Sequence, residues 1–543
     1  MLDDHLVVMA SEDRNYDAVV IGSGPSGRTV SLRLARNSFS VALVENELVG
    51  GDCAYWACIP SKALLRPPEA LTEAKEVDGS RQAAQGQLGV ESVLTRRDRF
   101  VDHWNDENMT KMLEEGGVDI IRGQGKLDGT RRVIVVSNNN SSSTSSNSNK
   151  NDSYSFSSKI KMVLVANHAV ILSTGSRAAI PSQIQGLEEA HPWTSRNATS
   201  AKKPPHSLAI IGDGAVACEM AHAWRALGTT EVSILSRNKR ILNKYEPFVG
   251  DRLAQAFKQR GIFIHNNVNV REVKRVNSTS KQGNGSTVQI MLDDGNNIPA
   301  EELLVAVGRK PNTDKLGLET VGLKPGDWLD VDDTCLVNGV DGGSEWLYAT
   351  GDINHRALLT HIGKYQARAC STAIVKRARG ETLGISNNNY RHDNSGRDST
   401  NSSNRNDAIN TGFDLSTMWL ATSDHRVVPQ VLFTDPQIAS VGLTEEGARS
   451  LKINVRTVDC EMGTMPGAQL HSDGYEGQAK IVTDEDRRVM VGATFVGPQV
   501  GDLLHAATIA IVGQVSLELL WHAIPSFPTV NEVWINLLEN YGF

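Results

Sequence analysis

The chain has 543 residues, of which 40% are hydrophobic and 22% are charged, and its formal net charge is -8. This composition is typical of a soluble globular protein with three or four domains, and the negative charge argues against general nucleic-acid binding. No apolar run approaches the length of a membrane span, and the acidic N-terminus lacks a signal or transit pattern. Six cysteines are too few for a disulfide framework, so we expect a reducing compartment, most simply the cytoplasm.

A glycine-rich turn lies between two short apolar runs near the N-terminus. Residues 16–21 form a valine-rich run that is typical of a buried parallel strand, and Gly-Ser-Gly-Pro-Ser-Gly follows at 22–27. A helix is predicted through Arg36, and a second strand at 41–44 comes next. Strand, glycine turn, helix and strand stand in the order that a dinucleotide site requires.

Each residue of this motif has a physical role in such a site. Gly22 allows the tight turn, Gly24 lets the backbone approach a pyrophosphate, and Gly27 allows close packing of helix and strand. Free N–H groups at the helix start, around Ser26, would hold the phosphate charge. Glu45 ends the second strand, where a carboxylate can accept a hydrogen bond from a ribose hydroxyl. A glycine turn in an ordinary α/β unit is the alternative.

A second copy of the pattern lies downstream. An apolar strand at 207–211 leads into Gly212, Gly214 and Ala217, and a further strand follows at 231–235. Two such units imply two nucleotides. This fits electron transfer between a pyridine nucleotide and a flavin, because cofactors carry the difficult redox chemistry.

The second unit differs from the first at the end of its second strand. Instead of an acid, that strand is followed by Arg237, Lys239 and Arg240. An acid would favour NAD, whereas cations accommodate the 2′-phosphate of NADP, and arginine binds phosphate through its planar fork. A basic surface loop is the alternative. The sequence therefore predicts NADPH rather than NADH at this site.

Cys53 and Cys58 form a CxxxxC pair shortly after the first unit. Two thiols at this spacing can close a disulfide across the first turn of a helix, and a helix N-terminus favours the reactive thiolate. The spacing alone also fits two unrelated cysteines. We expect the other four, Cys218, Cys335, Cys370 and Cys460, to be isolated packed thiols.

With this pair and its flanking Ile59-Pro60-Ser61-Lys62, the chain resembles the flavoprotein disulfide reductases, which include dihydrolipoamide dehydrogenase, glutathione reductase and mercuric reductase. The resemblance implies an α/β protein with two Rossmann-like domains and a C-terminal α+β interface domain. It also implies that Cys53 exchanges with substrate, that Cys58 packs on the flavin of FAD, and that Lys62 pairs with an acid, which Glu219 matches.

Other segments match the same family. Residues 171–176 and 348–352 resemble its FAD-binding stretches, and residues 304–312 resemble the return from the second nucleotide domain. The FAD positions implied here are Gly51, Lys62, Thr174, Gly175 and Asp352, the last on the ribitol, and Gly308 is implied for NADPH. Thr360 and His361 continue the match, with His361 more plausible as a helix-start residue than as a catalytic one.

The chain departs from the family near its C-terminus. Dithiol-handling members carry His-Pro-Thr-x-x-Glu, whose histidine acts as base in the partner subunit's site, but residues 527–532 read Phe-Pro-Thr-Val-Asn-Glu. Glu532 is in place, whereas Phe527 cannot take a proton. General base catalysis contributes a factor of about 100 to 10,000, so efficient dithiol turnover by the usual route is not expected. His522 could substitute, although a helix-end role is the simpler interpretation.

The predicted order of domains follows from these matches. It runs as an FAD-binding domain at 1–205 with a disordered insertion at 137–158, an NAD(P)H-binding domain at 206–330, an FAD-domain return at 331–385, a low-complexity linker at 386–425 and an interface domain at 426–543. A shorter polar stretch at 277–286 is also expected to be disordered.

We therefore expect a homodimeric enzyme without assigned metal ligands. Electrons would pass from NADPH through FAD to the Cys53–Cys58 disulfide and on to a disulfide or another small electrophile. The alternatives are a soluble transhydrogenase, diaphorase or quinone reductase that uses the flavin directly, and a redox sensor without turnover. No cysteine follows Cys460, which separates the chain from relatives that use a C-terminal cysteine pair.

Overall fold

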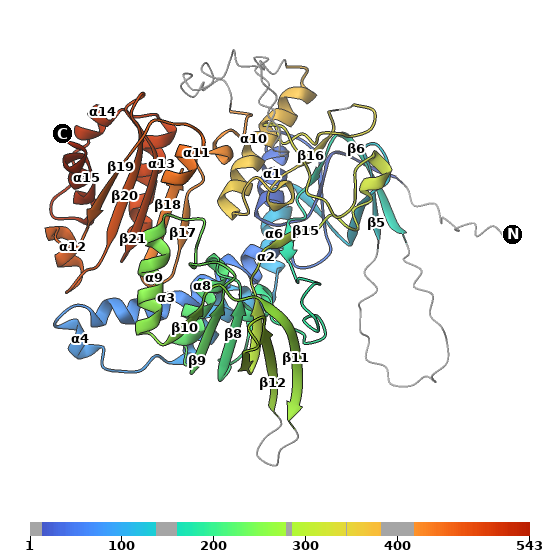
Figure 1. The fold of residues 1–543 in the computed structure, drawn as a ribbon. Helices are drawn as coiled ribbons and strands as arrows, with labels where there is room; N and C mark the ends of the chain where they lie inside the picture. The colour runs from blue at the N-terminus through green and yellow to red at the C-terminus, as the bar shows by residue number, and fades with distance from the viewer. Residues whose placement is uncertain (1–12, 137–159, 279–284, 344, 382–417) are drawn as a thin grey trace.

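The computed structural model describes residues 13–136, 160–278, 285–343, 345–381 and 418–543. The predicted insertion at 137–158 and most of the predicted linker lie outside these residues. Figure 1 shows three units: an N-terminal unit, a second unit below it, and a C-terminal unit to one side. The α/β class and the three-unit plan predicted from the sequence are confirmed.

The N-terminal unit is built on a seven-stranded sheet of order β3-β2-β1-β6-β5-β4, in which β16 also pairs with β6. Its central strand β1 pairs in parallel with β2 and with β6, and the strand interiors are buried and valine-rich, as expected for a sheet covered on both faces. The strands are β1 (Arg14–Ile21), β2 (Val41–Glu45), β3 (Val118–Arg122), β4 (Gln124–Leu127), β5 (Arg132–Val136), β6 (Ile160–Leu172) and β16 (Leu347–Ala349).

In this unit, a helix from the N-terminal part of the chain packs against a helix from the part that returns after the second unit. Helix α1 follows the first glycine turn and lies against α10, which belongs to the returning chain. The helices are α1 (Pro25–Ala35), α2 (Gly51–Tyr55), α3 (Cys58–Lys75), α4 (Ser80–Ala83), α5 (Val90–Phe100), α6 (Glu107–Glu115) and α10 (Thr360–Ala378).

The second unit holds a four-stranded parallel sheet of order β10-β9-β8-β14 and a three-stranded antiparallel sheet of order β11-β12-β13. Asn277 pairs with Ser286 across β11 and β12, so the ends of the polar stretch at 277–286 are strand rather than the disorder we expected. Its elements are α7 (Ser195–Ser200), β8 (Ser207–Ile211), α8 (Ala215–Ala226), β9 (Glu231–Leu235), α9 (Pro247–Gln259), β10 (Ile262–His265), β11 (Val270–Ser278), β12 (Gly285–Leu292), β13 (Asn297–Ala300) and β14 (Glu302–Val305).

The C-terminal unit is a five-stranded antiparallel sheet of order β17-β18-β21-β20-β19 with helices packed against it, which is the α+β arrangement predicted. Its elements are β17 (Gln430–Leu432), β18 (Gln437–Gly442), α11 (Glu445–Ser450), β19 (Val455–Glu461), α12 (Pro466–His471), β20 (Gln478–Asp484), β21 (Val489–Gly497), α13 (Leu504–Val512), α14 (Leu517–Trp521) and α15 (Val533–Tyr541).

Two boundaries differ from the sequence prediction. Strand β15 (Arg309–Pro311) pairs with β7 (Ser176–Ala178), and Leu316 and Leu318 join the core of the N-terminal unit, so the chain returns there well before residue 331. Residues 418–425, at the end of the predicted linker, are also packed: Ala421 is buried and the amide of Gln366 donates to the Asp424 carboxylate.

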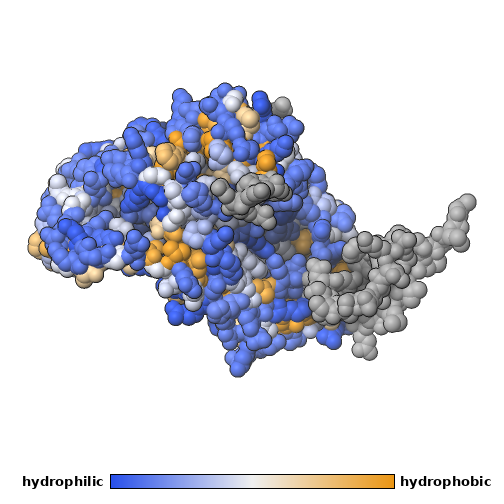
Figure 2. All heavy atoms as spheres, turned by 90° about the horizontal axis from the view of Figure 1, so that it is seen from below, coloured by the Kyte–Doolittle hydropathy of each residue, from blue (hydrophilic) through white to orange (hydrophobic). Residues whose placement is uncertain are grey.

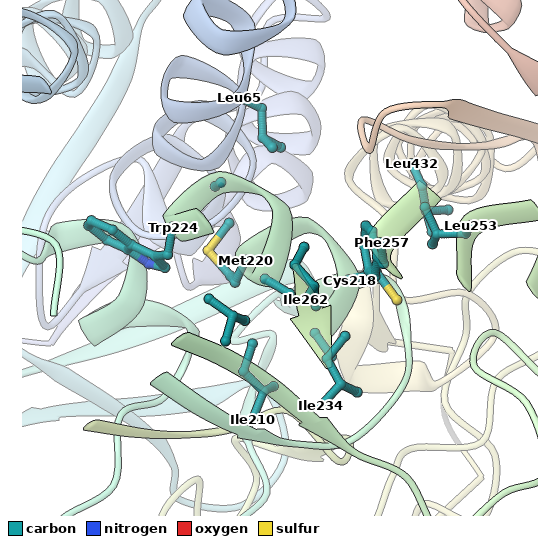
Figure 3. Packing of buried hydrophobic residues seen from close by; sticks show 14 of the residues in the cluster. Leu65, Ile210, Cys218, Met220, Trp224, Ile234, Leu253, Phe257, Ile262 and Leu432 are labelled. Carbon is teal, nitrogen blue, oxygen red and sulfur yellow. The ribbon is translucent and has the colours of Figure 1, made fainter. Parts of the chain in front are cut away.

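One core cluster joins all three units. Figure 3 shows Met220 and Trp224 of α8 and Phe257 of α9 among the residues of this cluster, while Leu65 of α3 and Leu432 of β17 approach from the other two units. In contrast to this apolar core, the face of the molecule seen from below in Figure 2 is mostly hydrophilic, and its apolar residues lie in separate patches. Within the described ranges, no helix combines the length and the apolarity of a bilayer span.

Removing a large side chain from this cluster should cost stability. Phe257 is fully buried, so Phe257→Ala should lower the free energy of unfolding by about 3–5 kcal/mol through lost burial and a cavity. Phe263, on the neighbouring strand β10, is 58% exposed, and Phe263→Ala should cost less than about 1 kcal/mol. Urea denaturation followed by circular dichroism measures both, and equal losses would contradict the assignment of the core.

Candidate active site

The first glycine turn leaves open space beside one residue and crowds the other two. Gly22 has a φ of 98°, and a Cβ there would lie 2.5 Å from the carbonyl oxygen of Ser173. A Cβ on Gly27 would overlap the carbonyl of Gly22, whereas one on Gly24 would meet nothing within 4 Å. Helix α1 begins directly after Gly24 without a side-chain cap, so its first N–H groups remain available to an anion.

Residues from distant segments surround this turn. The backbone N–H and hydroxyl of Ser23 donate to Glu45 at 2.9 and 2.6 Å, which fixes the carboxylate at the end of β2. The hydroxyl of Ser26 donates to Thr350 at 2.7 Å and to the carbonyl of Gly363 at 2.9 Å. The sequence motif gave no sign of Ser23 or Thr350 as supports.

The later segments that are predicted to bind FAD lie next to one another. The side-chain amide of Asn312 donates to the carbonyl of Thr174 at 2.9 Å, and Gly175 has a φ of 68° with open space at its Cβ position. The hydroxyl of Ser176 donates to Asp352 at 2.5 Å. Thus the chain brings residues near 22, 45, 174 and 352 to one region, although they are distant in sequence.

The second turn repeats the geometry of the first. Gly212 has a φ of 118°, and a Cβ there would overlap the carbonyl of Ala306, whereas Gly214 faces open space. Ala217 replaces the third glycine and is fully buried, so this turn accommodates a methyl group where the first does not. Gly308 has a φ of 142° and open space beside it.

The three basic residues after β9 do not share one environment. Arg237 and Lys239 are exposed, whereas Arg240 forms an ion pair with Asp251 at 2.7 Å. The Asp213 carboxylate, inside the glycine turn, accepts from Ser236 and from the Asn238 amide. These hydrogen bonds therefore hold the glycine turn against the end of β9, and the side chains of Arg237 and Lys239 are exposed to solvent.

Cys53 and Cys58 lie where α2 and α3 meet. A Cβ on Gly51, at the start of α2, would lie 2.8 Å from the Cα of Gly24, so the redox segment packs directly on the first glycine turn. Both cysteines are partly buried free thiols that form a hydrogen bond with each other. The hydroxyl of Thr360, at the first position of α10, lies 3.3 Å from the sulfur of Cys58.

The two thiols have opposite acidities. The hydrogen bond from Cys53 lowers the pKa of Cys58 to about 6, with further stabilisation from Thr360 and the positive charge of Lys62. The pKa of Cys53 is raised far above its usual value by the same hydrogen bond and by burial. Near neutral pH the reduced pair therefore consists of a Cys58 thiolate and a Cys53 thiol.

The predicted partners Lys62 and Glu219 meet in the structure. Their Nζ–Oε2 distance is 2.8 Å, and the Glu219 side chain is only 8% exposed. The backbone N–H of Phe433, from the C-terminal unit, donates to the same carboxylate at 3.0 Å. The ammonium of Lys62 thus stands one helical turn from Cys58, fixed by a buried acid.

A charged network flanks Cys53 that sequence patterns did not reveal. Asp52 accepts from Arg196 at 2.6 Å and from Arg309 at 3.1 Å. The guanidinium of Arg196 also lies 4.2 Å from the ring centre of Trp56, a cation–π contact. Arg196 and Arg309 come from the segments that connect the two nucleotide-binding units, so they help to fix the redox loop.

The C-terminal motif lies on the surface of the isolated chain. Phe527 is 73% exposed, and Glu532 accepts from the backbone N–H of Gly467 at 3.0 Å rather than orienting a base. His522 is exposed at the end of α14. His361 shares a hydrogen bond of 2.8 Å with the carbonyl of Pro429, which agrees with a structural role near the helix start.

One expectation about the remaining cysteines was wrong. Cys335 and Cys370 are not isolated thiols: both are fully buried in the same core cluster, and the side chain of Cys370 raises the pKa of Cys335. Cys370 lies in α10 and Cys335 precedes β16 in the chain, so the pair forms only through tertiary packing. Sequence spacing could not have indicated it.

Two dinucleotide-binding turns, with a dithiol and a lysine–glutamate pair between them, define an oxidoreductase that works with nucleotide cofactors. The sequence matches the pyridine nucleotide-disulphide oxidoreductase family over residues 16–373 and that family's dimerisation domain over residues 428–537. The chain belongs to this family.

Individual relatives agree with this assignment. Mercuric reductase from Staphylococcus aureus is 26% identical over 528 residues, covering 96% of this chain and 82% of that protein. Dihydrolipoyl dehydrogenase from Chlamydia trachomatis serovar D is 25% identical over 523 residues, covering 96% and 95%. The fold is shared with the HOCl-induced flavoprotein disulfide reductase RclA from Escherichia coli, solved as a Cu(II) complex, with a TM-score of 0.72, 19% identity, and coverage of 97% and 99%.

The family uses FAD and a nicotinamide nucleotide, and the residues present fit both. The open space beside Gly24 and Gly214, the uncapped starts of α1 and α8, and the carboxylate of Glu45 suit two pyrophosphate-containing ligands. The chemistry that a flavin supplies there is two-electron exchange between a reduced nicotinamide and a disulfide.

Thr360 should tune the acidity of Cys58. In the reduced holoenzyme, the long-wavelength thiolate–flavin absorbance should persist above about pH 6 and disappear below it, because a lowered pKa keeps Cys58 ionised down to that pH. Thr360→Val removes a hydrogen bond to the thiolate and should move the midpoint up by about one pH unit. A pH titration of this band measures it.

Thr372→Val is the matched control, because Thr372 lies in the same helix and its hydroxyl donates to the carbonyl of Arg368 in that helix. An unchanged midpoint in Thr360→Val would show that Thr360 does not act on the thiolate.

Proposed function

We propose that this protein is an NADPH-dependent reductase that delivers two electrons through Cys53 and Cys58 to an electrophilic acceptor. The observation that carries the proposal is the asymmetric dithiol: a stabilised Cys58 thiolate on the Lys62 side, and Cys53 as its hydrogen-bonded partner. A pair whose first thiolate is already stabilised is suited to repeated opening and closing rather than to a structural disulfide.

Cys53, Cys58 and Lys62 have different roles in the proposed reaction. With a disulfide acceptor, the Cys53 sulfur forms a bond to one acceptor sulfur, the bond between the two acceptor sulfurs breaks, and the proton of Cys53 passes to the acceptor sulfur that is released. Cys58 then attacks the Cys53 sulfur, which closes the Cys53–Cys58 disulfide and releases the second acceptor thiolate. The acceptor gains the two electrons that the pair loses. Lys62, held by Glu219, balances the negative charge at Cys58 during these steps.

Phe527 limits the acceptors that this pair serves well. The family's base would take the Cys53 proton, and phenylalanine cannot, so acceptors that form strong bonds to sulfur without base assistance are favoured. The name of one relative, mercuric reductase, supports this direction, since it denotes an enzyme that acts on a mercuric ion. We therefore favour soft metal ions and reactive electrophiles over unactivated disulfides.

We further propose that the enzyme is a homodimer. The matched dimerisation domain supports this, as do large apolar side chains left exposed on one segment: Leu519 at 61%, Ile524 at 86% and Phe527 at 73%. Exposed apolar residues that gather in one segment are typical of a surface that another chain covers.

Cys53→Ser tests the route of electrons. In the purified holoenzyme, NADPH should still bleach the flavin, whereas reduction of Hg(II), Cu(II), a quinone or a small disulfide should fall at least about 100-fold with the best acceptor, because the exchanging thiol is gone. Cys460→Ser, a buried thiol in the C-terminal unit, is the control and should retain activity. Full acceptor reduction by Cys53→Ser would instead favour a transhydrogenase or diaphorase that uses the flavin directly.

Arg237 and Lys239 should determine the choice of nucleotide. Replacing both with alanine should lower the specificity constant for NADPH by at least about tenfold while leaving that for NADH nearly unchanged, because only NADPH carries the 2′-phosphate. Steady-state kinetics with both nucleotides measures the ratio. Lys244→Ala, an exposed cation in the same loop region, is the control. A wild-type preference for NADH would overturn the proposal.

A further inference from the structure

Residues 102–104, between α5 and α6, form a left-handed turn although none of them is glycine. The φ angles of Asp102, His103 and Trp104 are 49°, 51° and 58°. In this region the Cβ atom of an L-residue crowds the following carbonyl oxygen. The side-chain amide of Asn108 donates to the Asp102 carboxylate at 2.7 Å and helps to hold the turn. Three such residues in succession persist only where surrounding contacts maintain them, so the contacts of this turn indicate what it positions.

Trp104, the last residue of this turn, contacts the loop between the two redox cysteines. Its indole Nε1–H donates to the carbonyl of Tyr55 at 3.2 Å, and Tyr55 is the last residue of α2. The next carbonyl, that of Trp56, accepts from the hydroxyl of Thr199 in α7 at 2.8 Å. Carbonyl groups at a helix C-terminus lack partners within the helix, so these two side chains supply donors where the end of α2 leaves acceptors open.

Arg97 of α5 joins these two contacts. Its side chain is fully buried and donates to the carbonyl of Thr199 at 2.5 Å, and its guanidinium lies 5.5 Å from the ring centre of Trp104. Asp98 pairs with Arg97 at 2.6 Å and with Lys202 at 3.3 Å, and the Lys202 ammonium lies 4.3 Å from the same ring centre. Because a buried charge must remain paired, this network fixes Trp104 and Thr199 relative to each other.

We propose that Trp104 is a positioning residue that, together with Thr199, holds this loop so that Cys58 stays within reach of Cys53 while the disulfide opens and closes. A loop fixed at two successive carbonyls samples fewer conformations than a free one. The inference rests on the proposed function only in taking Cys53 as the thiol that exchanges with the acceptor.

The step that depends on this positioning is the closing of the disulfide. In the mixed disulfide between Cys53 and an acceptor sulfur, the Cys58 thiolate attacks the Cys53 sulfur. The Cys53–Cys58 bond forms, the bond to the acceptor breaks, and the acceptor sulfur leaves as a thiolate with the electron pair. The attack is intramolecular, so its equilibrium depends on the effective concentration of Cys58 at Cys53, which the fixed loop raises.

Equilibration with glutathione tests the inference without NADPH or the unidentified acceptor. The holoenzyme is held anaerobically in mixtures of reduced and oxidised glutathione near neutral pH, quenched with acid and alkylated. Mass spectrometry then quantifies the dithiol, the disulfide and the mixed disulfide of Cys53 with glutathione. Trp104→Phe keeps an aromatic ring near Arg97 and removes the N–H donor. It should lower the equilibrium constant for closing the disulfide from the mixed disulfide about fivefold, the effect of losing one typical hydrogen bond.

Trp346→Phe is the matched control. Trp346 is fully buried in the same unit, and within the described residues its Nε1 atom has no hydrogen-bond partner. This variant should keep the wild-type closing equilibrium even where it loses stability, which separates positioning from a general loss of packing. If Trp104→Phe does not fold, Thr199→Val, which removes the other donor, takes its place with the same expected shift.

A wild-type closing equilibrium in the folded test variant, or an equal shift in Trp346→Phe, would overturn the inference. Failure of the proposed function is distinct from this outcome. In that case the wild-type pair would close normally in glutathione and yet pass no electrons from NADPH to an acceptor.

Discussion

The ion pair between Lys62 and Glu219 is the contact on which the geometry of the site depends. Glu219 is almost fully buried, and a buried carboxylate is costly unless it is paired and hydrogen-bonded. Its partners come from both other units: Lys62 from α3 and the backbone of Phe433 from the C-terminal unit. Satisfying one carboxylate therefore fixes how the three units meet, with Leu65 and Leu432 closing the apolar core beside it (Figure 3).

Local requirements made much of this architecture predictable. Gly22 and Gly212 have positive φ and no room for a side chain, and such constraints are written directly in the sequence as glycine. The spacing of Cys53 and Cys58, and the match of Lys62 and Glu219 to the family's lysine and acid, could likewise be read directly from the sequence. Thr360 could not be assigned in this way, because it reaches Cys58 from 302 positions away through the packing of α10 on α1.

Packing also decides where the domains begin and end, which composition does not show. Residues 309–330 were predicted to belong to the nucleotide-binding unit, yet Leu316 and Leu318 bury their side chains against the first sheet. Ala421 and Asp424 follow a polar segment, but a buried network with Arg356 and Gln366 holds them in place. The buried contact between Cys335 and Cys370 arises in the same region for the same reason.

The distribution of charge at the dithiol explains why a missing base need not abolish the enzyme. Cys58 is stabilised by a hydrogen bond, a hydroxyl and a nearby ammonium, so loading the pair with two electrons leaves only one proton to be handled. That proton belongs to Cys53, whose ionisation next to a thiolate is unfavourable. Acceptors that bind sulfur strongly displace this proton themselves, whereas ordinary disulfides require the thiolate to form first. Under the proposed function, the ionisation of Cys53 would therefore separate acceptors that bind sulfur strongly from ordinary disulfides.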